Sequence, residues 1–378
     1  MKQKLMIIGM GDLAWWTLEI LLRTPEFAEH VEVLVCDKNE ETGVRRVNSA
    51  LMASSQTHTA ANVYFQVIDC FNLERVAETI FAYKPDLIFD GTSLQSWWVI
   101  TRLSSEMYRQ IDKARYGPWI PMHCTLTYNI MLAVKLSGLA PKVINCGFPD
   151  ITNCALGKLG LAPHIGIGNV DNMVPPVRFL VAEKEGVPVE SVQVYMFMGH
   201  FLSYYVSRFN TTAKCPFILR IYVNGADVTA KHEPEALLCE ASQRYRRQGG
   251  TAAHSVVGAS CAKNVLHTLR DTRTLTHSPG PCGLPGGYPV RIGRDKVEVA
   301  LPPGVSLEEA VKVNMETNMF DGIEEICDDG TVVITDESYT IMKDLLGYDC
   351  KQMKLEEAAD WARELHAKFE AWATGASK

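Results

Sequence analysis

The stretch Leu5–Ala14, L-M-I-I-G-M-G-D-L-A, decides the fold of this chain. A short apolar segment runs into a glycine turn and then into an amphipathic segment, which is the order of a buried strand, a phosphate-binding turn and a helix N-terminus. Gly9 permits the tight turn, and Gly11 lets the backbone approach a pyrophosphate. The helix start, at Asp12 and Leu13, offers free N–H groups to an anion. We therefore predict a dinucleotide site here; the alternative is a structural turn that binds nothing.

The acid expected to bind the ribose of the cofactor is Asp37. It ends a second apolar run, Val31–Cys36, at the distance from the glycine turn that an NAD site requires. This placement favours NAD over NADP, although the neighbouring Lys38 could weaken the preference. Asp12 argues against the site, because its carboxylate could compete with phosphate for the same amides.

Strand and helix signals alternate over the first 90 residues. Helices are expected at Asp12–Arg23 and Leu73–Ala82, and further strands at Val63–Val67 and Leu87–Asp90. Gly91 and Thr92 directly follow the last of these strands, at the end where an open α/β sheet binds ligands. The alternation predicts an α/β fold with a doubly wound parallel sheet of Rossmann type, forming an NAD(P)-binding domain over residues 1–150.

The pattern changes after residue 150, where we predict a mixed α+β catalytic domain over residues 151–378. Asn224–Gly225 is a strong signal for a two-residue hairpin turn. The expected elements are strands at Val192–Met198, Phe217–Val223, Pro289–Ile292 and Lys296–Leu301, and helices at Thr125–Leu136, Ala236–Arg247, Ser255–Leu269 and Leu355–Trp372. The last of these helices is amphipathic. The segment 94–118 is expected to be a helix or a mobile cover for the cofactor.

Composition excludes several classes of function. The chain has 378 residues and a formal net charge of −7, which gives no reason to expect nucleic acid or an anionic membrane as a partner. Its 11 cysteines include no C-x-x-C pair, and the N-terminus enters a predicted strand without a signal-peptide pattern. We therefore expect reduced thiols and a cytoplasmic location.

Features of the second half resemble the lactate/malate dehydrogenase superfamily. The segment Ile165–Val187, I-G-I-G-N-V-D-N-M-V-P-P-V-R-F-L-V-A-E-K-E-G-V, is followed by M-G-H at Met198–His200. The segment Val143–Asn153 is similar to the asparagine-proline segment of that family, and Tyr288–Gly293 to its late β pair. The resemblance lies in the order of the features and spans most of the chain.

The resemblance implies a proton-transfer pair. His200 would be the catalytic histidine and Asp171 its carboxylate partner, because imidazole titrates near neutral pH and a neighbouring carboxylate raises its pKa. Asn145 would lie beside the nicotinamide. Arg178 is the candidate clamp for a substrate carboxylate, and the alternative for it is a structural salt bridge. Arg102 and Arg109 are further candidates for a substrate-binding arginine.

These features together predict an NAD(P)-dependent oxidoreductase that acts on a hydroxyl or keto group, or an amino or imino group, of a small polar metabolite. Two alternatives stay open: a redox-neutral lyase, hydrolase or isomerase that uses transient oxidation, and a non-catalytic dinucleotide sensor. Cysteines and histidines such as Cys146 and His254 have no standard metal-ligand spacing, so no metal is expected. His254 could instead reach the substrate. The resemblance also implies a homodimer or homotetramer.

The first testable prediction is that the chain binds NADH more tightly than NADPH. The carboxylate of Asp37 would accept hydrogen bonds from the ribose hydroxyls and repel a 2′-phosphate. Fluorescence titration with each cofactor measures the two dissociation constants, and comparable values would contradict the prediction.

Overall fold

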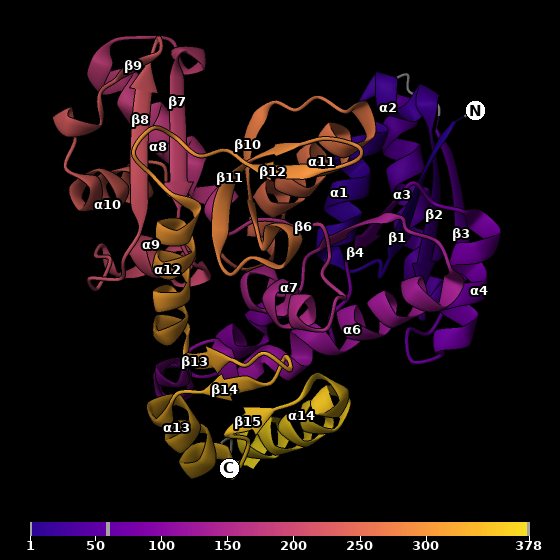
Figure 1. Ribbon diagram of the computed structural model, residues 1–378. Helices are drawn as coiled ribbons and strands as arrows, with labels where there is room; N and C mark the ends of the chain where they lie inside the picture. Colours follow the sequence, from indigo (N-terminus) through magenta and orange to yellow (C-terminus); the bar gives the residue numbers. More distant parts are fainter. Residues whose placement is uncertain (1, 58–60, 376–378) are drawn as a thin grey trace.

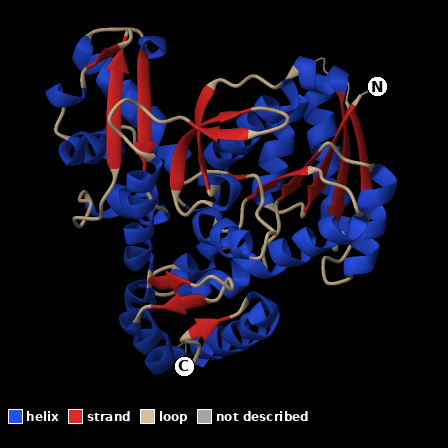
Figure 2. Ribbon diagram, viewed as in Figure 1, coloured by secondary structure: helices blue, strands red, loops and turns tan. Residues whose placement is uncertain are grey.

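The centre of the molecule is a six-stranded, all-parallel sheet with strand order β3-β2-β1-β4-β5-β6 (Figure 1, Figure 2). The computed structural model describes residues 2–57 and 61–375. This strand order is that of a doubly wound dinucleotide-binding fold, which confirms the predicted fold class. The strands are β1 (Gln3–Ile8), β2 (Val31–Asp37), β3 (Asn62–Val67), β4 (Leu87–Asp90), β5 (Lys142–Asn145) and β6 (Ile165–Gly166).

The sheet buries both faces, because successive side chains of a strand point to opposite sides. In β1, Met6 and Ile8 belong to one apolar core, whereas Leu5 and Ile7 belong to the other. The helices that contribute to the first core include α4 (Leu73–Tyr83), α6 (Ile120–Ser137) and α7 (Pro149–Lys158). Those that contribute to the second core include α1 (Asp12–Leu22), α2 (Pro25–His30), α3 (Glu40–Gln56) and α11 (His254–Arg270).

A separate core lies under an antiparallel sheet in the upper left of Figure 1. Its strands are β7 (Val192–Phe197), β8 (Ile218–Val223) and β9 (Ala226–Asp227), and its helices are α8 (Val170–Glu185), α9 (His200–Phe209) and α10 (Pro234–Arg244). Asn224 and Gly225 both have positive φ and join β8 to β9. The predicted hairpin is therefore confirmed.

Two further antiparallel sheets complete the second half. The first consists of β10 (Leu275–Pro279), β11 (Gly287–Ile292) and β12 (Val297–Val299), and it contains the predicted late β pair. After it, α12 (Leu307–Asn318) leads through the short helix η8 (Met319–Asp321) to the second sheet. That sheet and its helices are β13 (Ile323–Ile326), β14 (Val332–Ile334), β15 (Gln352–Met353), α13 (Asp336–Leu346) and α14 (Ala358–Gly375).

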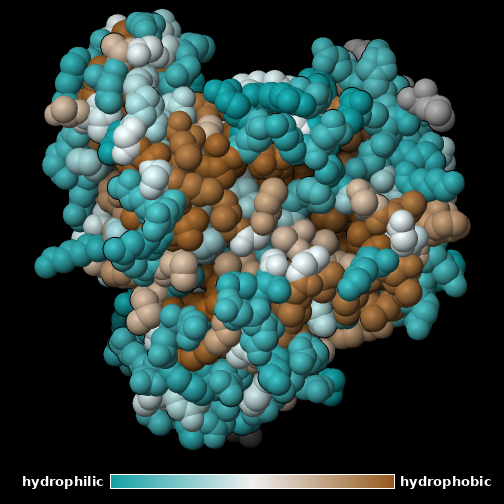
Figure 3. Space-filling model, viewed as in Figure 1, coloured by the Kyte–Doolittle hydropathy of each residue, from teal (hydrophilic) through white to brown (hydrophobic). Residues whose placement is uncertain are grey.

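The C-terminal helix returns the chain to the first domain. Its buried face, which includes Ala362, Leu365 and Phe369, joins the same core as α4 and α6. Phe369 packs edge-on against Trp119, with 5.3 Å between the ring centroids. On the face shown in Figure 3, polar residues cover the upper and lower ends and apolar residues gather across the middle, where the parts of the molecule meet.

Several elements differ from the sequence prediction, among them α3, α10 and the segment 94–118. Helix α3 was not predicted, although the Asn39 side chain caps it by accepting from Thr42 N. Helix α10 ends at Arg244 rather than Arg247, because the Tyr245 ring is held against α8 by Phe179, at 5.4 Å between centroids. The segment 94–118 folds as short helices: η1 (Trp97–Arg102), α5 (Ser105–Ile111), η2 (Asp112–Ala114) and η3 (Gly117–Trp119).

The domain boundary at residue 150 stays a prediction, since apolar packing crosses it at Phe148 and Ile151. None of the helices in the described part of the chain combines the length and the apolar character needed to cross a bilayer.

Replacing Phe369 with alanine should lower the free energy of unfolding by about 3–5 kcal/mol, the usual cost of removing a large buried ring. The ring is 2% exposed and fills the contact between α14 and α6. Urea denaturation at 25 °C measures the change, and the exposed neighbour Glu370→Ala is the control. A loss no larger than that of the control would show that α14 is not anchored there.

Candidate active site

The turn between β1 and α1 forms the floor of a cavity. Gly9 has φ +86°, and a Cβ there would lie 2.7 Å from Thr92 Cγ2. A Cβ on Gly91 would lie 2.9 Å from the Gly9 carbonyl oxygen. The two loops that follow β1 and β4 therefore approach more closely than any larger residue allows.

The same turn presents unpaired backbone amides. In the described chain, no acceptor is found for the N–H groups of Gly11, Asp12 and Leu13, as expected for the first turn of a helix. A Cβ at Gly11 would meet open space. The Asp12 carboxylate pairs with Arg46 and so is held by a cation of its own. The amides thus remain available to an anion.

Around this turn lies a cavity of about 350 Å³. The predicted cofactor residues that line it are Gly9, Gly11, Asp12, Leu13, Asp37, Lys38, Gly91 and Thr92. The carboxylate of Asp37 also fixes the turn, since Oδ2 accepts from Met10 N at 2.6 Å and Oδ1 from Asn39 N at 2.8 Å. The stretch that decides the fold therefore also builds the cavity.

Asn145 does not line this cavity, which corrects its predicted place. Its side chain is fully buried, and Oδ1 accepts from Gly147 N at 2.6 Å while Nδ2 donates to Asn153 Oδ1 at 2.8 Å. These bonds hold the segment after β5, whose Cys146 and Gly147 do line the cavity. Asn145 thus supports the cavity wall from below.

A second cavity, of about 580 Å³, adjoins the first. Five residues line both: Leu13, Trp97, Tyr116, Cys146 and His254. One face of α9 forms a wall of the second cavity, because its residues His200, Ser203, Tyr204, Ser207 and Arg208 recur at the spacing of a helix.

His200 and Asp321 form a pair at the wall of the second cavity. His200 Nδ1 lies 2.9 Å from Asp321 Oδ1, and the two side chains are 14% and 2% exposed. Tyr204 also donates to Asp321 Oδ1, at 3.4 Å. The contact with Asp321 engages Nδ1 of His200, so that Nε2 is the ring nitrogen left for a ligand.

The environment of His200 raises its pKa. Burial lowers the pKa, but the charge and hydrogen bond of Asp321, with the charge of Asp150, raise it above its ordinary value of 6.5. A pKa higher in the folded than in the unfolded chain stabilises the fold fully below about pH 6.5, and this contribution is lost as pH rises through the folded-state pKa. The pair is therefore built to hold a proton near neutral pH.

Aromatic rings enclose the imidazole. The centroids of Tyr116 and Phe148 lie 4.7 and 4.8 Å from that of His200. The Tyr116 hydroxyl and His123 Nε2 share a hydrogen bond of 2.8 Å. Burial lowers the pKa of His123 to about 3, which keeps that ring neutral. Burial also raises the pKa of Asp150 to about 6. His200 thus differs from its neighbour His123, because its pKa is raised and its ring lines the second cavity.

The packing of α12 against the start of α9 brings His200 and Asp321 together. A Cβ on Gly199, the residue before His200, would lie 1.9 Å from Thr317 Oγ1 on α12. This close contact sets α12 against the start of α9, and Asp321 follows one turn after Thr317. The partner of His200 therefore comes from 121 residues away.

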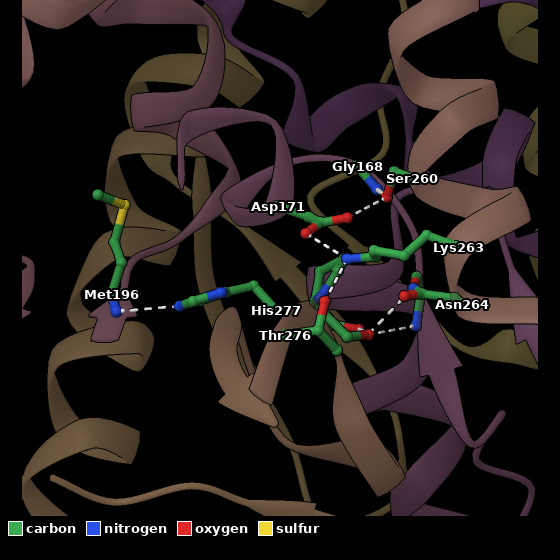
Figure 4. Close-up of polar contacts among 11 residues, drawn as sticks. Gly168, Asp171, Met196, Ser260, Lys263, Asn264, Thr276 and His277 are labelled. Carbon is green, nitrogen blue, oxygen red and sulfur yellow. Dashed lines mark hydrogen bonds and ion pairs between the residues drawn. The ribbon is translucent and has the colours of Figure 1, made fainter. Parts of the chain in front are cut away.

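Asp171 is not the partner of His200, which corrects the predicted relay. Its Oδ1 accepts from Lys263 Nζ and its Oδ2 from Ser260 Oγ, both at 2.5 Å (Figure 4). Lys263 also donates to Thr276. The Asp171 side chain lies in the first turn of α8 and faces α11, where it joins α8 to α11 and β10.

The predicted arginines lie elsewhere as well. Arg178 donates to the carbonyls of Val192 and Val189, at 3.0 and 2.8 Å, and so attaches α8 to the start of β7. Arg102 lies over the Trp98 ring at 4.1 Å, and Arg109 pairs with Glu106 at 2.6 Å. Among the residues that line the second cavity, none of these three occurs. The predicted clamp role of Arg178 is corrected accordingly.

Other arginines take their place in the cavity wall. Arg115, Arg208, Arg246 and Arg247 line it, against a single acidic residue among the described lining residues, Asp112. The sequence did not predict these arginines as site residues. Arg247 falls at the end of the expected helix Ala236–Arg247, and Arg115 belongs to no recognisable sequence motif.

No cluster of three or more metal-ligating side chains is found within residues 2–57 and 61–375. Cys146 lines both cavities, but burial raises the pKa of its thiol well above the ordinary value, which disfavours a reactive thiolate. His254 lines both cavities too, and its ring meets that of Trp97 edge-on at 6.4 Å. The expectation that His254 could reach a substrate therefore stands as a prediction.

Comparison with known proteins identifies the fold. No family model matches the sequence, and no curated protein is significantly similar to it. Among solved structures, lactate dehydrogenase from Cryptosporidium parvum, with lactic acid and NAD, is 15% identical, with 85% of this chain and 98% of that chain covered and a TM-score of 0.54.

Two other solved structures are similar to this chain in fold. Malate dehydrogenase from Plasmodium falciparum is 14% identical over 90% of this chain and 100% of that chain, with a TM-score of 0.57. Lactate dehydrogenase from Eimeria maxima, with NADH and oxamate, is 14% identical over 100% and 97%, with a TM-score of 0.55. The chain thus has the fold of the lactate and malate dehydrogenases, as the sequence resemblance predicted.

Proposed function

We propose that this protein is an NAD-dependent oxidoreductase that transfers a hydride to or from the carbon of a hydroxyl or keto group in a small polar metabolite. One observation carries the proposal: the cavity built by the glycine turn opens into a second cavity whose wall holds the His200–Asp321 pair. A carbon held where the cavities join would lie between a dinucleotide and a proton donor.

The first cavity fits a dinucleotide. Its free amides at the start of α1 suit a pyrophosphate, and the open space at Gly11 lets the phosphate approach. Asp37 stands at the end of β2, where the carboxylate suits ribose hydroxyls. When bound, the nicotinamide dinucleotide supplies or accepts the hydride.

His200 moves the proton. As the imidazolium it donates from Nε2 to a carbonyl oxygen during reduction, and as the neutral ring it accepts the hydroxyl proton during oxidation. Asp321 fixes the tautomer through Nδ1 and stabilises the imidazolium. This support matters because His200 is the first residue of α9, and the positive end of a helix disfavours a cation.

The choice of NAD over NADP, the assembly into a homodimer or homotetramer and the cytoplasmic location remain predictions. The Asp37 carboxylate supports the choice of NAD, and the family resemblance supports the assembly.

Replacing His200 with asparagine should lower kcat by roughly 10²–10⁴-fold, the usual worth of general acid–base catalysis, and leave NADH binding nearly unchanged. The assay follows NADH absorbance with a panel of 2-oxo and 2-hydroxy acids. His366→Asn, on an exposed part of α14, is the control. Full activity of His200→Asn would refute the mechanism, and turnover with no net change in NADH would favour a redox-neutral enzyme.

Replacing Asp321 with asparagine should shift the pH profile of ketone reduction to lower pH. Reduction needs the imidazolium, so the rate falls as pH rises through the pKa of His200. Asp321 is the main cause that raises this pKa above its ordinary value, and burial opposes it, so that loss of the Asp321 charge lowers the pKa of His200. The pH dependence of kcat/KM measures the shift, with the exposed Asp344→Asn as control. An unmoved profile would exclude Asp321 as the partner.

A further inference from the structure

The wall of the second cavity is basic, although the protein as a whole is acidic. The whole chain has a formal net charge of −7, yet four arginines line this cavity against one acid. Arg208 has a carboxylate partner, because its Nη1 lies 3.1 Å from Asp112 Oδ1. Arg115, Arg246 and Arg247 have no carboxylate partner among the described residues. Arg246 is exposed to solvent, whereas Arg115 and Arg247 are partly buried, so that two uncompensated guanidinium charges lie within the wall.

Arg247 is held only by neutral groups. Its Nη2 donates to the Ser203 carbonyl at 3.4 Å, and its Nη1 donates to Asn172 Oδ1 at 3.0 Å with the amide oxygen facing it. Burial lowers the pKa of this guanidinium. A partly buried cation without an anion is costly, and an anionic ligand removes that cost. Ser203 lies one helical turn from His200, so this anion would lie next to the reacting carbon.

Arg115 has a strained backbone conformation. Its backbone has φ 63° and ψ −168°, a region occupied almost only by glycine. Its guanidinium makes no hydrogen bond or ion pair within the described residues and lies 5.7 Å from the ring centroids of both Phe201 and Tyr205. The strained backbone places a free cation at the cavity wall.

The two cations lie on opposite flanks of α9. With 3.6 residues per turn, Ser203 lies on one side of the stripe that runs from His200, and Phe201 and Tyr205 lie on the other. A helix with its side chains is about 10 Å wide, which sets the order of the separation between the guanidinium groups. The cavity wall itself follows α9 for about 12 Å, from His200 to Arg208.

We infer that the substrate is an extended organic dianion, longer than a four-carbon diacid, with one acidic group bound by Arg247 beside the reacting carbon and the other by Arg115. The inference rests on the proposed function, because it takes this cavity as the substrate site. Guanidinium forks suit carboxylates and phosphates alike, and the shared requirement is two separated anionic groups. Leu103, Tyr108 and Phe148 would contact the apolar part between them.

The experiment measures binding of a series of unbranched dicarboxylates, from succinate to sebacate, to the full chain by calorimetry, with monocarboxylates of equal carbon number alongside. Affinity should rise beyond succinate, and the best diacid should bind at least tenfold more tightly than its matched monoacid. Arg247→Met and Arg115→Met should each reduce diacid affinity at least tenfold, to the level of the monoacid. Arg109→Met, nearby but outside the cavity wall, is the matched control and should change nothing.

Arg115→Gly separates binding from folding. Glycine relieves the strained backbone, so this variant should unfold at a temperature no lower than the wild type and still lose the preference for diacids. Equal binding of diacids and monoacids, a best ligand of four carbons, or unchanged diacid affinity in Arg247→Met would overturn the inference. Diacid binding without any NADH-linked turnover would instead defeat the proposed function and leave the dianion site standing.

Discussion

The pairing of His200 with Asp321 is the interaction on which the candidate active site depends. A histidine at the N-terminus of a helix, enclosed by aromatic rings, would be neutral without a carboxylate, because both burial and the helix dipole disfavour its charge. Asp321 reverses that balance. The need to hold this carboxylate in place explains why Gly199 packs without a side chain against Thr317.

The carboxyl edge of the parallel sheet organises the rest of the site. Strands β1, β4 and β5 all end there, and the close packing of Gly9 against Gly91 lets the loops that follow them line one cavity. Beneath the surface, Asp90 accepts from Thr92 and Thr127, at 2.6 and 2.7 Å, and Asn145 holds the loop after β5. Buried polar groups thus fix the cavity from below, while the described backbone amides of Gly11, Asp12 and Leu13 at the start of α1 stay unpaired.

The sequence was sufficient wherever the signal was local. The glycine turn, the position of Asp37 at the end of a strand, the strand Leu87–Asp90 and the Asn224–Gly225 hairpin all agree with the structure. Each of these follows from turn chemistry or from a short buried strand, which neighbouring residues decide.

Long-range choices could not be predicted. Asp171 and Asp321 are both buried acids, and only the packing of α8 on α11 and of α12 on α9 decides which one meets His200. The sequence predicted that Arg247 lies in the helix Ala236–Arg247, and therefore not at a cavity. The helix ends earlier because Tyr245 contacts α8, and a tertiary contact of this kind cannot be read from the local sequence. Arg115 has a backbone conformation that is typical of glycine, and an arginine in the sequence does not indicate it.

The position of Asp321 in the chain has a consequence for how the molecule is made. Apart from His254, every residue that lines the first cavity precedes residue 148, and all six strands of the parallel sheet precede residue 167. Asp321 leaves the ribosome much later, after α12. Synthesis from the N-terminus therefore delivers nearly all of the cavity lining early, whereas α11 and α14, which complete the two cores of the sheet, and the counter-ion of His200 arrive only with the second half of the chain.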